Sequence, residues 1–316
     1  MEKRRLGDSE LLVGPLAFGG NVFGWTVDHK AGFELLDAFV ASGLNLIDTA
    51  DVYTRWAHGA KGGESETIIG AWMKARNNRD KVVIATKVGM EMGPHEKGLS
   101  RRWITTAVEQ SLRRLQTDYI DLYQAHTDDA AIPQEETADA FADLVKAGKV
   151  RILGASNFSG DRLTLALQTS ARKGVPRYQT LQPHYNLYER AAFETGIQGV
   201  CVAETVGVIP YYPLASGFLS GKYRSQADLG KSKRGGGMAK YMNPRGFRIL
   251  DALDEVAHGA NATPARVSLA WLMQRPGVVA PIASVTSRAQ LEDIVKATQL
   301  KLSAAETELL DLASAP

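Results

Sequence analysis

Eight short apolar segments alternate with amphipathic stretches along the sequence, and this alternation constrains the fold more than any other feature. The segments are rich in Val, Ile, Leu and Tyr, which is typical of strands buried on both faces; they are Leu16–Phe18, Leu44–Ile47, Val82–Ala85, Ile120–Tyr123, Val150–Leu153, Tyr178–Leu181, Val206–Pro210 and Val278–Ile282. Helices are expected over Ala31–Ser42, Glu64–Ala75, Leu99–Leu115, Ile132–Ala147, Asp161–Ala171, Glu189–Glu204, Pro264–Gln274 and Arg288–Thr298. This alternation predicts an α/β fold, a closed (β/α)8 TIM barrel rather than an open doubly wound sheet.

The segments around this repeat support a barrel. An open dinucleotide-binding sheet normally carries G-x-G-x-x-G after its first strand, and residues 19–24 (GGNVFG) lack that pattern. At the start of the chain, Arg4–Leu6 and Leu12–Gly14 flank a Gly-Asp-Ser turn, which predicts a β-hairpin that plugs the N-terminal end of the barrel. After the repeat, Ser303–Ala313 begins with a capping box and predicts an extra C-terminal helix.

Nothing in the sequence marks an internal domain boundary. No Pro- or Ser-rich linker and no shift in composition interrupts it, so residues 1–316 are expected to form a single domain. The three glycines at 235–237 follow Lys231, Lys233 and Arg234, and they predict a long mobile loop inside the seventh strand–helix connection.

Composition excludes several functional classes. The chain has 37 basic and 35 acidic residues, a net charge of +2, which is too balanced for a protein dedicated to nucleic acid or to a membrane surface. The single cysteine, Cys201, excludes an internal disulfide and cannot alone build a thiolate metal site. The first residues lack an apolar secretion signal, and no segment approaches 18 apolar residues. We therefore expect a soluble cytoplasmic protein without a bound metal.

Polar side chains stand where several expected strands end, which is where barrel enzymes place their active sites. Asp48 ends the second strand, with Tyr53 five residues further on, while Lys87 ends the third strand and His126 the fourth. Each residue has a structural alternative: Asp48 as a helix cap, Lys87 as a solvated loop end, His126 as a satisfied rim histidine. Because packing does not explain four such residues at one edge of a barrel, the combination predicts an active site.

Seven segments also resemble the aldo-keto reductase superfamily, in its bacterial and potassium-channel-β-like branch. They occur in the expected order across nearly the whole chain: LNLIDTADVY, IATKVG, DYIDLYQAH, GKVRILGASNF, LQPHYNLYER, YYPLASGFLSGKY and PIASVTSRAQLED. The resemblance implies a (β/α)8 barrel, NADPH or NADP⁺ as the cofactor, and reversible reduction of a small carbonyl compound to an alcohol. It also implies that Asp48, Tyr53, Lys87 and His126 form the catalytic tetrad.

The chemistry of a carbonyl reduction suits these residue types. Hydride addition leaves an alkoxide, which needs a proton donor, and we expect the Tyr53 phenol to be that donor. The ammonium of Lys87 is expected to lower the pKa of this phenol towards the working pH. Asp48 would hold Lys87 in place, and His126 would hydrogen-bond the carbonyl oxygen and orient it. The hydride itself would belong to the cofactor.

By the same resemblance, cofactor contacts come from the ends of the last four strands. The nicotinamide would meet Ser156, Asn157, Gln182 and Tyr211, with Tyr211 stacked on its ring. The loop after the seventh strand would contact the cofactor, mainly at its pyrophosphate, through Pro213, Leu214, Ser216, Gly217, Lys222 and Arg234. The adenosine phosphate would meet a helix N-terminus, a ready anion site, through Ser284, Thr286, Arg288, Gln290 and Asp293.

This adenosine end keeps an alternative open, since Thr286 and Ser287 could only cap the helix. Many relatives have Gly where Ser284 stands and Asn where Ile294 stands. The first difference could alter the approach of the phosphate, and the second removes an adenine contact.

Aromatic residues are the candidates for contacting the substrate. Phe23 and Trp25 follow the first strand, and Trp56 lies beyond Tyr53. An apolar, aromatic mouth suits aldehydes, ketones and sugar-derived or polycyclic carbonyls, without selecting among them.

Two other functions compete with carbonyl reduction. A Schiff-base lyase could use Lys87, but it would leave Tyr53, Asn157, Gln182 and Tyr211 unexplained. An NADPH-binding regulatory module could resemble the β-subunits of potassium channels. Those subunits have a regulatory N-terminal extension, and we expect none here because the hairpin starts by residue 4. The complete tetrad also favours turnover.

Overall fold

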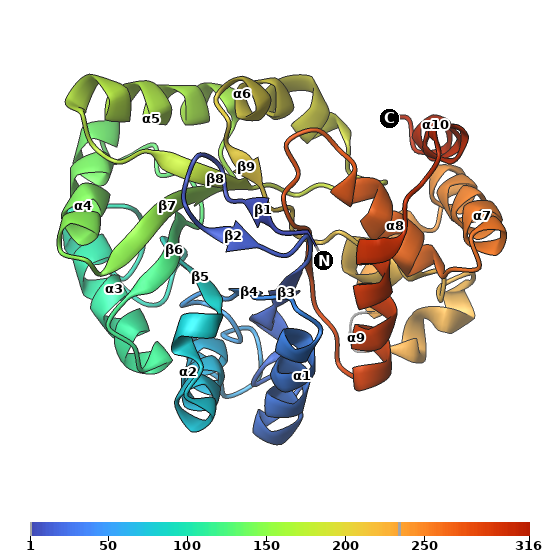
Figure 1. Ribbon diagram of the computed structural model, residues 1–316, viewed down its shortest axis with the longest axis horizontal. Helices are drawn as coiled ribbons and strands as arrows, with labels where there is room; N and C mark the ends of the chain where they lie inside the picture. The colour runs from blue at the N-terminus through green and yellow to red at the C-terminus, as the bar shows by residue number, and fades with distance from the viewer. Residues whose placement is uncertain (1, 233–234) are drawn as a thin grey trace.

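The computed structural model describes residues 2–232 and 235–316, in which eight parallel strands form one sheet (Figure 1). The sheet order is β10-β3-β4-β5-β6-β7-β8-β9. The two edges of this sheet are joined into a barrel by hydrogen bonds between β9 and the segment before β10. Val208 N donates to Gly277 O at 2.9 Å, and Val279 N donates to Val208 O at 2.8 Å. The predicted (β/α)8 barrel is confirmed. Its strands are β3 (Ala17–Gly19), β4 (Leu46–Asp48), β5 (Val83–Val88), β6 (Ile120–Ala125), β7 (Val150–Ser156), β8 (Tyr178–Gln182), β9 (Gly207–Val208) and β10 (Ile282–Ala283).

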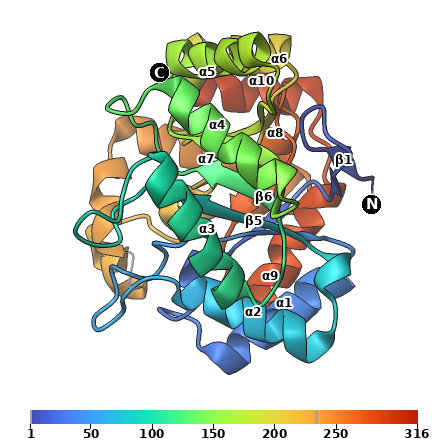
Figure 2. The ribbon, with the colours of Figure 1, turned by 90° about the vertical axis from the view of Figure 1, so that its left-hand side faces the viewer.

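Helices surround the barrel on its outer side, as two perpendicular views show (Figures 1 and 2). Hydroxyl side chains cap several of their N-termini by accepting a backbone N–H, which satisfies a donor that the first turn leaves free; these are Ser100, Ser159, Thr263 and Ser287. The helices that follow the strands are α1 (His29–Ala41), α2 (Glu64–Arg76), α3 (Arg101–Leu115), α4 (Gln134–Lys146), α5 (Gly160–Lys173), α6 (Gln198–Ala203), α8 (Pro264–Met273) and α9 (Arg288–Val295). All were expected from the sequence.

One helix was missed. The sequence interpretation placed a long loop between β9 and α8, but the chain forms α7 over Pro244–Gly259 there. Asn243 caps this helix and Pro244 occupies its first turn, a start signal that the preceding glycine-rich stretch obscured. Short 3-10 helices occupy Gln226–Lys231 and Gly235–Tyr241 in the same connection. In Figure 1, α7 lies beside the extra C-terminal helix α10 (Ala304–Ala313), whose predicted capping box is present.

The N-terminal hairpin closes one end of the barrel, as predicted. Its strands β1 (Arg4–Arg5) and β2 (Leu12–Val13) pair antiparallel and lie across the barrel in Figure 1. Gly7 turns the hairpin with a φ of +60°, and a Cβ there would meet the carbonyl oxygen of Gln179 at 2.1 Å. The guanidinium of Arg4 donates to three carbonyl oxygens of residues 273–279. The hairpin thus leaves only the opposite end of the barrel open for chemistry.

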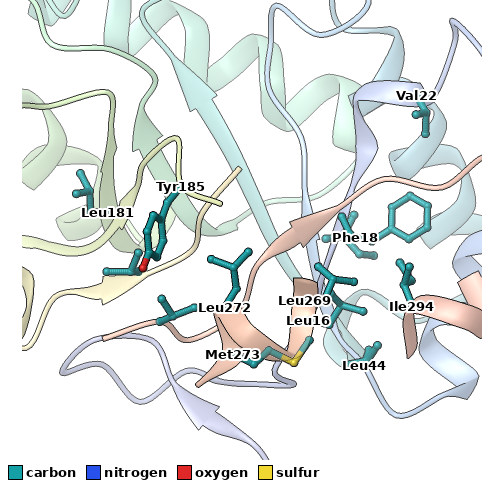
Figure 3. Close-up of a cluster of buried hydrophobic side chains, with 14 of the residues drawn as sticks. Leu16, Phe18, Val22, Leu44, Leu181, Tyr185, Leu269, Leu272, Met273 and Ile294 are labelled. Carbon is teal, nitrogen blue, oxygen red and sulfur yellow. The ribbon is translucent and has the colours of Figure 1, made fainter. Parts of the chain in front are cut away.

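Apolar side chains fill both sides of the sheet. Inside the barrel, Leu6 and Val13 of the hairpin segment pack with Leu46, Val83 and Leu122 from the strands. Outside, a larger cluster joins the strands to the helices, and Figure 3 shows the part where β3 meets α8 and α9. Among the described residues, no helix is long and apolar enough to cross a membrane.

Candidate active site

Three residues of the predicted tetrad form one hydrogen-bonded cluster at the carboxyl ends of β4 and β5. Lys87 Nζ donates to Asp48 Oδ2 at 2.8 Å, to the hydroxyl of Tyr53 at 2.8 Å and to the carbonyl oxygen of Thr49 at 2.7 Å. These contacts use all three hydrogens of the ammonium. The Tyr53 hydroxyl donates in turn to Asp48 Oδ2 at 3.2 Å. Because Asp48 and Lys87 are almost fully buried, the ion pair has one fixed geometry.

The second oxygen of Asp48 is held from across the barrel. Gln182 Nε2 donates to Asp48 Oδ1 at 2.9 Å, and Gln124 Nε2 lies 3.4 Å from the same oxygen. Sequence reasoning missed Gln124. The signal was present: Gln124 stands two residues before His126, so the two-residue period of a strand places both on one face. The amide nitrogen of Gln182 thus orients Asp48, and the expected contact of Gln182 with the nicotinamide stays a prediction.

The electrostatics differ from the expectation in one respect. Loss of solvent raises the pKa of Tyr53 well above 10, and the neighbouring Asp48 acts in the same direction. Burial and Asp48 therefore outweigh the predicted lowering of this pKa by Lys87, and Tyr53 is a protonated phenol at neutral pH. Burial lowers the pKa of Lys87, while Asp48 opposes that effect. Tyr53 is thus in the form that can donate a proton.

His126 lies directly after β6, beside Tyr53, with their ring centres 6.0 Å apart. Burial and the charge of Lys87 lower the pKa of His126 well below 6.5, so its imidazole is neutral at pH 7. Among the described residues nothing hydrogen-bonds its buried Nδ1. A buried N–H without an acceptor is rarer and costlier than a bare acceptor, which places the single proton on Nε2.

The predicted nicotinamide residues also gather here, bonded to one another. Asn157 Nδ2 donates to the carbonyl oxygen of His126 at 2.9 Å, and its Oδ1 accepts from the Tyr211 hydroxyl at 2.9 Å. Ser156 Oγ donates to the carbonyl oxygen of Gln182 at 2.8 Å. Asn157 has a φ of +56°, an uncommon backbone state that this network holds.

The loop after β9 has an unusual backbone. Tyr212, Ala215 and Ser216 have φ values of 52°, 47° and 59°, and Gly217 follows at 109°. Left-handed backbone at non-glycine residues is strained and concentrates at ligand sites. The exposed Lys222 lies nearby, with its Nζ 5.1 Å from the centre of the Tyr223 ring, and its charge is available to an anion. Pro213 and Leu214 lie in this loop, whereas Arg234 falls outside the described residues.

At the predicted adenosine end, most polar groups have partners in the protein. Ser287 caps the N-terminus of α9, which is the capping role that the sequence left open for it. Gln290 accepts hydrogen bonds from Thr286. Arg288 is a surface residue paired with Glu292 at 2.9 Å. The remaining polar positions are bonded elsewhere: Ser284 to Asn21, and Asp293 to Thr263 and Arg266. Ile294 is buried in the core.

Two of the three aromatic candidates lie beside the tetrad. Trp56 is half exposed and contacts Tyr53 edge-on, with ring centres 5.9 Å apart. Trp25 contacts Trp56 in turn at 6.0 Å. Phe23 does not share this position: it is fully buried and stacks on Phe18 in the core. Its side chain has no surface with which to contact a substrate.

Comparison with known proteins identifies the family to which the chain is similar. The model of a family described as Aldo/keto reductase family matches residues 15–315. The chain is 35% identical to the "Uncharacterized oxidoreductase YrpG" of Bacillus subtilis (strain 168), over 96% of this chain and 92% of that protein. It is 33% identical to "Aldo-keto reductase AMT2" of Alternaria alternata, over 98% and 90%. It is 31% identical to a "Probable voltage-gated potassium channel subunit beta" of Arabidopsis thaliana, over 95% and 92%.

Proposed function

The chain belongs to the aldo/keto reductase family, and from that premise we propose that it reduces aldehydes or ketones reversibly to alcohols with NADPH. The observation that carries this proposal is the position of Lys87 Nζ, 2.8 Å from both the Tyr53 hydroxyl and Asp48 Oδ2. That arrangement provides a phenol that can give up a proton and a cation that stabilises the resulting anion. An oxidoreductase acting on carbonyl groups needs both at one point.

Each residue of the tetrad has a separate role in the proposed reduction. Tyr53 gives its proton to the alkoxide oxygen of the substrate and becomes a phenolate. The Lys87 ammonium already donates a hydrogen bond to the Tyr53 oxygen. When the phenolate forms, this hydrogen bond joins a cation to an anion and becomes stronger. Asp48, held by Gln182 and Gln124, keeps the ammonium in place. The Nε2–H of His126 donates to the carbonyl oxygen and orients it.

The cofactor proposal rests on the residues that would hold NADPH. When bound, NADPH supplies the hydride. Tyr211, fixed through Asn157, offers an aromatic face for the nicotinamide. The strained loop at 215–217 and the exposed ammonium of Lys222 suit a pyrophosphate. The N-terminus of α9 and Arg288 suit the adenosine phosphate.

Two competing functions are less well supported. A Schiff-base lyase needs an unprotonated lysine that a substrate carbonyl can reach. Lys87 is fully buried and donates all three hydrogens inside the protein. A regulatory NADPH-binding module agrees with the potassium channel relative, but such a module has no need of a complete proton relay. Turnover therefore separates the regulatory alternative from the reductase.

The decisive experiment is a turnover assay. The purified protein should oxidise NADPH, followed by its absorbance, in the presence of at least one member of a panel of aldehydes, ketoses and diketones. Binding of NADPH without turnover on the whole panel would favour the regulatory module. Trapping of a substrate on Lys87 by borohydride would favour the lyase.

Cofactor selectivity gives a first prediction. Arg288→Ala should weaken NADPH binding by about one order of magnitude and leave NADH binding nearly unchanged, because a guanidinium–phosphate hydrogen bond contributes roughly 1.5–3 kcal/mol and Arg288 must first leave Glu292. Fluorescence titration with both cofactors measures the effect, which should shrink at high salt because Arg288 is exposed.

The matched control for this prediction is Glu292→Gln, which frees Arg288 from its ion pair and should not weaken NADPH binding. Equal losses for NADH and NADPH in Arg288→Ala would make Arg288 a structural residue. No loss for either cofactor would move the phosphate contact to Lys222.

A further inference from the structure

Behind the tetrad lies a buried carboxyl group that the proposed reaction does not use. Asp51 is 2% exposed, and neither of its carboxyl oxygens has a hydrogen-bond partner among the described residues. Other buried acids are well satisfied: Asp48 by the groups above, and Asp121 by the backbone N–H of Ile84 and two arginines. Asp51 is therefore an exception that needs a physical reason.

The groups around Asp51 are already matched in charge. Glu66 of α2 pairs with Arg114 of α3 at 2.6 Å and accepts from the hydroxyl of Thr86 at 2.5 Å. Lys87 of β5 pairs with Asp48. On β6, Tyr123 is neutral, because burial raises the pKa of its hydroxyl well above 10. A negative charge on Asp51 would thus have no counter-ion of its own: the nearby cations Arg114 and Lys87 are paired with Glu66 and Asp48, and the backbone N–H of Val52 gives only partial support.

The consequence is that Asp51 retains its proton. Burial, reinforced by the negative charge of Glu66, raises the pKa of Asp51 to about 8. Lys87 and Asp51 also influence each other, since Lys87 favours the ionised form of Asp51 and an ionised Asp51 raises the pKa of Lys87. The backbone links the two residues as well, because Asp51 N donates to the carbonyl oxygen of Lys87 at 3.4 Å.

We propose that Asp51 is a positioning residue that acts through Lys87: its buried carboxyl group, whose oxygens have no hydrogen-bond partner among the described residues, gains a charge that sustains the Lys87 ammonium. The reductase needs that ammonium to stabilise the Tyr53 phenolate. Asp51 therefore extends the pH range of reduction upward. This inference rests on the proposed function for its kinetic consequence, but not for the protonation of Asp51 itself.

Infrared spectroscopy of the protein without substrate tests the protonation. The wild type should show the carbonyl-stretch band of a buried protonated carboxyl group, and this band should disappear with a midpoint near pH 8. Asp51→Asn should abolish the band. The control Asp251→Asn, which changes an exposed carboxyl on α7, should leave it unchanged. Absence of the band in the wild type at pH 6 would overturn the proposal.

The pH dependence of kcat tests the coupling between Asp51 and Lys87. In Asp51→Asn, the alkaline limb of kcat for carbonyl reduction should move to lower pH by roughly one unit, since a nearby charge shifts a pKa by one unit or more. Asp251→Asn should leave the limb in place. Conversely, Lys87→Met should move the midpoint of the infrared band to higher pH, because the charge that favours ionised Asp51 is gone. An unchanged midpoint or an unchanged limb would overturn the coupling.

Failure of this inference can be told apart from failure of the proposed function. If no carbonyl substrate is turned over, the reductase function fails, and the two infrared measurements still decide the state of Asp51 and its coupling to Lys87. If turnover is present and the band or the coupling is absent, only the inference about Asp51 fails.

Discussion

Tyr53→Phe should lower kcat for carbonyl reduction roughly 10²-fold or more while NADPH binding is retained. The phenol hydroxyl is the group placed to protonate the substrate oxygen, and phenylalanine keeps the ring but has no proton to give. The hydroxyl also accepts from Lys87 and donates to Asp48, so its loss leaves those two residues paired with each other. Stopped-flow or steady-state kinetics measures kcat, and quenching of protein fluorescence measures NADPH binding.

The matched control is Tyr119→Phe. Tyr119 precedes β6 at the opposite end of the barrel, where its ring lies under the Arg79 guanidinium, so removal of its hydroxyl should leave kcat within about twofold. Near-wild-type turnover in Tyr53→Phe would remove Tyr53 from the proposed proton transfer. Equal losses in the two variants would indicate a general effect on the fold.

Lys87→Met should reduce kcat at neutral pH by roughly two orders of magnitude or more, because the phenolate of Tyr53 loses the cation 2.8 Å away. The same change leaves Asp48 as a buried carboxylate held only by amide and hydroxyl donors. The unfolding free energy should therefore fall by a few kcal/mol, as expected when one partner of a buried pair is removed. Kinetics and thermal unfolding across pH measure the two effects.

Asp48→Asn should shift the pH dependence of activity to lower pH, because it acts on the pKa of Lys87. Asp48 opposes the lowering of the Lys87 pKa by burial. Without Asp48 the ammonium loses its proton at a lower pH, so activity present at pH 6 should decline earlier as pH rises. The loss at neutral pH should be smaller than in Lys87→Met. Unchanged pH–rate profiles in both variants would contradict the proposed relay.

Much of the site could be predicted from the sequence because its signals are local. A strand end is visible in a short apolar segment, and Asp48, Lys87 and His126 each follow such a segment. The parallel barrel then brings those ends to one edge, whatever the details of packing. The hairpin and the last helix were equally readable, since their turn and capping residues act within a few positions.

Other features depend on residues far apart in the sequence. Asp48 is oriented by Gln124 and Gln182, which stand 76 and 134 positions away. Phe23 follows a strand as Trp25 does, yet only packing against Phe18 shows that Phe23 is buried. Local pattern cannot distinguish such cases, because hydrogen-bond partners and burial are set by distances across the barrel.

The order of the residues was sufficient to predict the alternating elements, the closed barrel and the types of residue at its open end. The charge states of those residues depend on the fold. The pKa of Tyr53 rises rather than falls, and Asp51 keeps a proton between two ion pairs. The physical reason is that desolvation depends on how much water the folded chain removes from each group, and that quantity has no counterpart in the order of the residues.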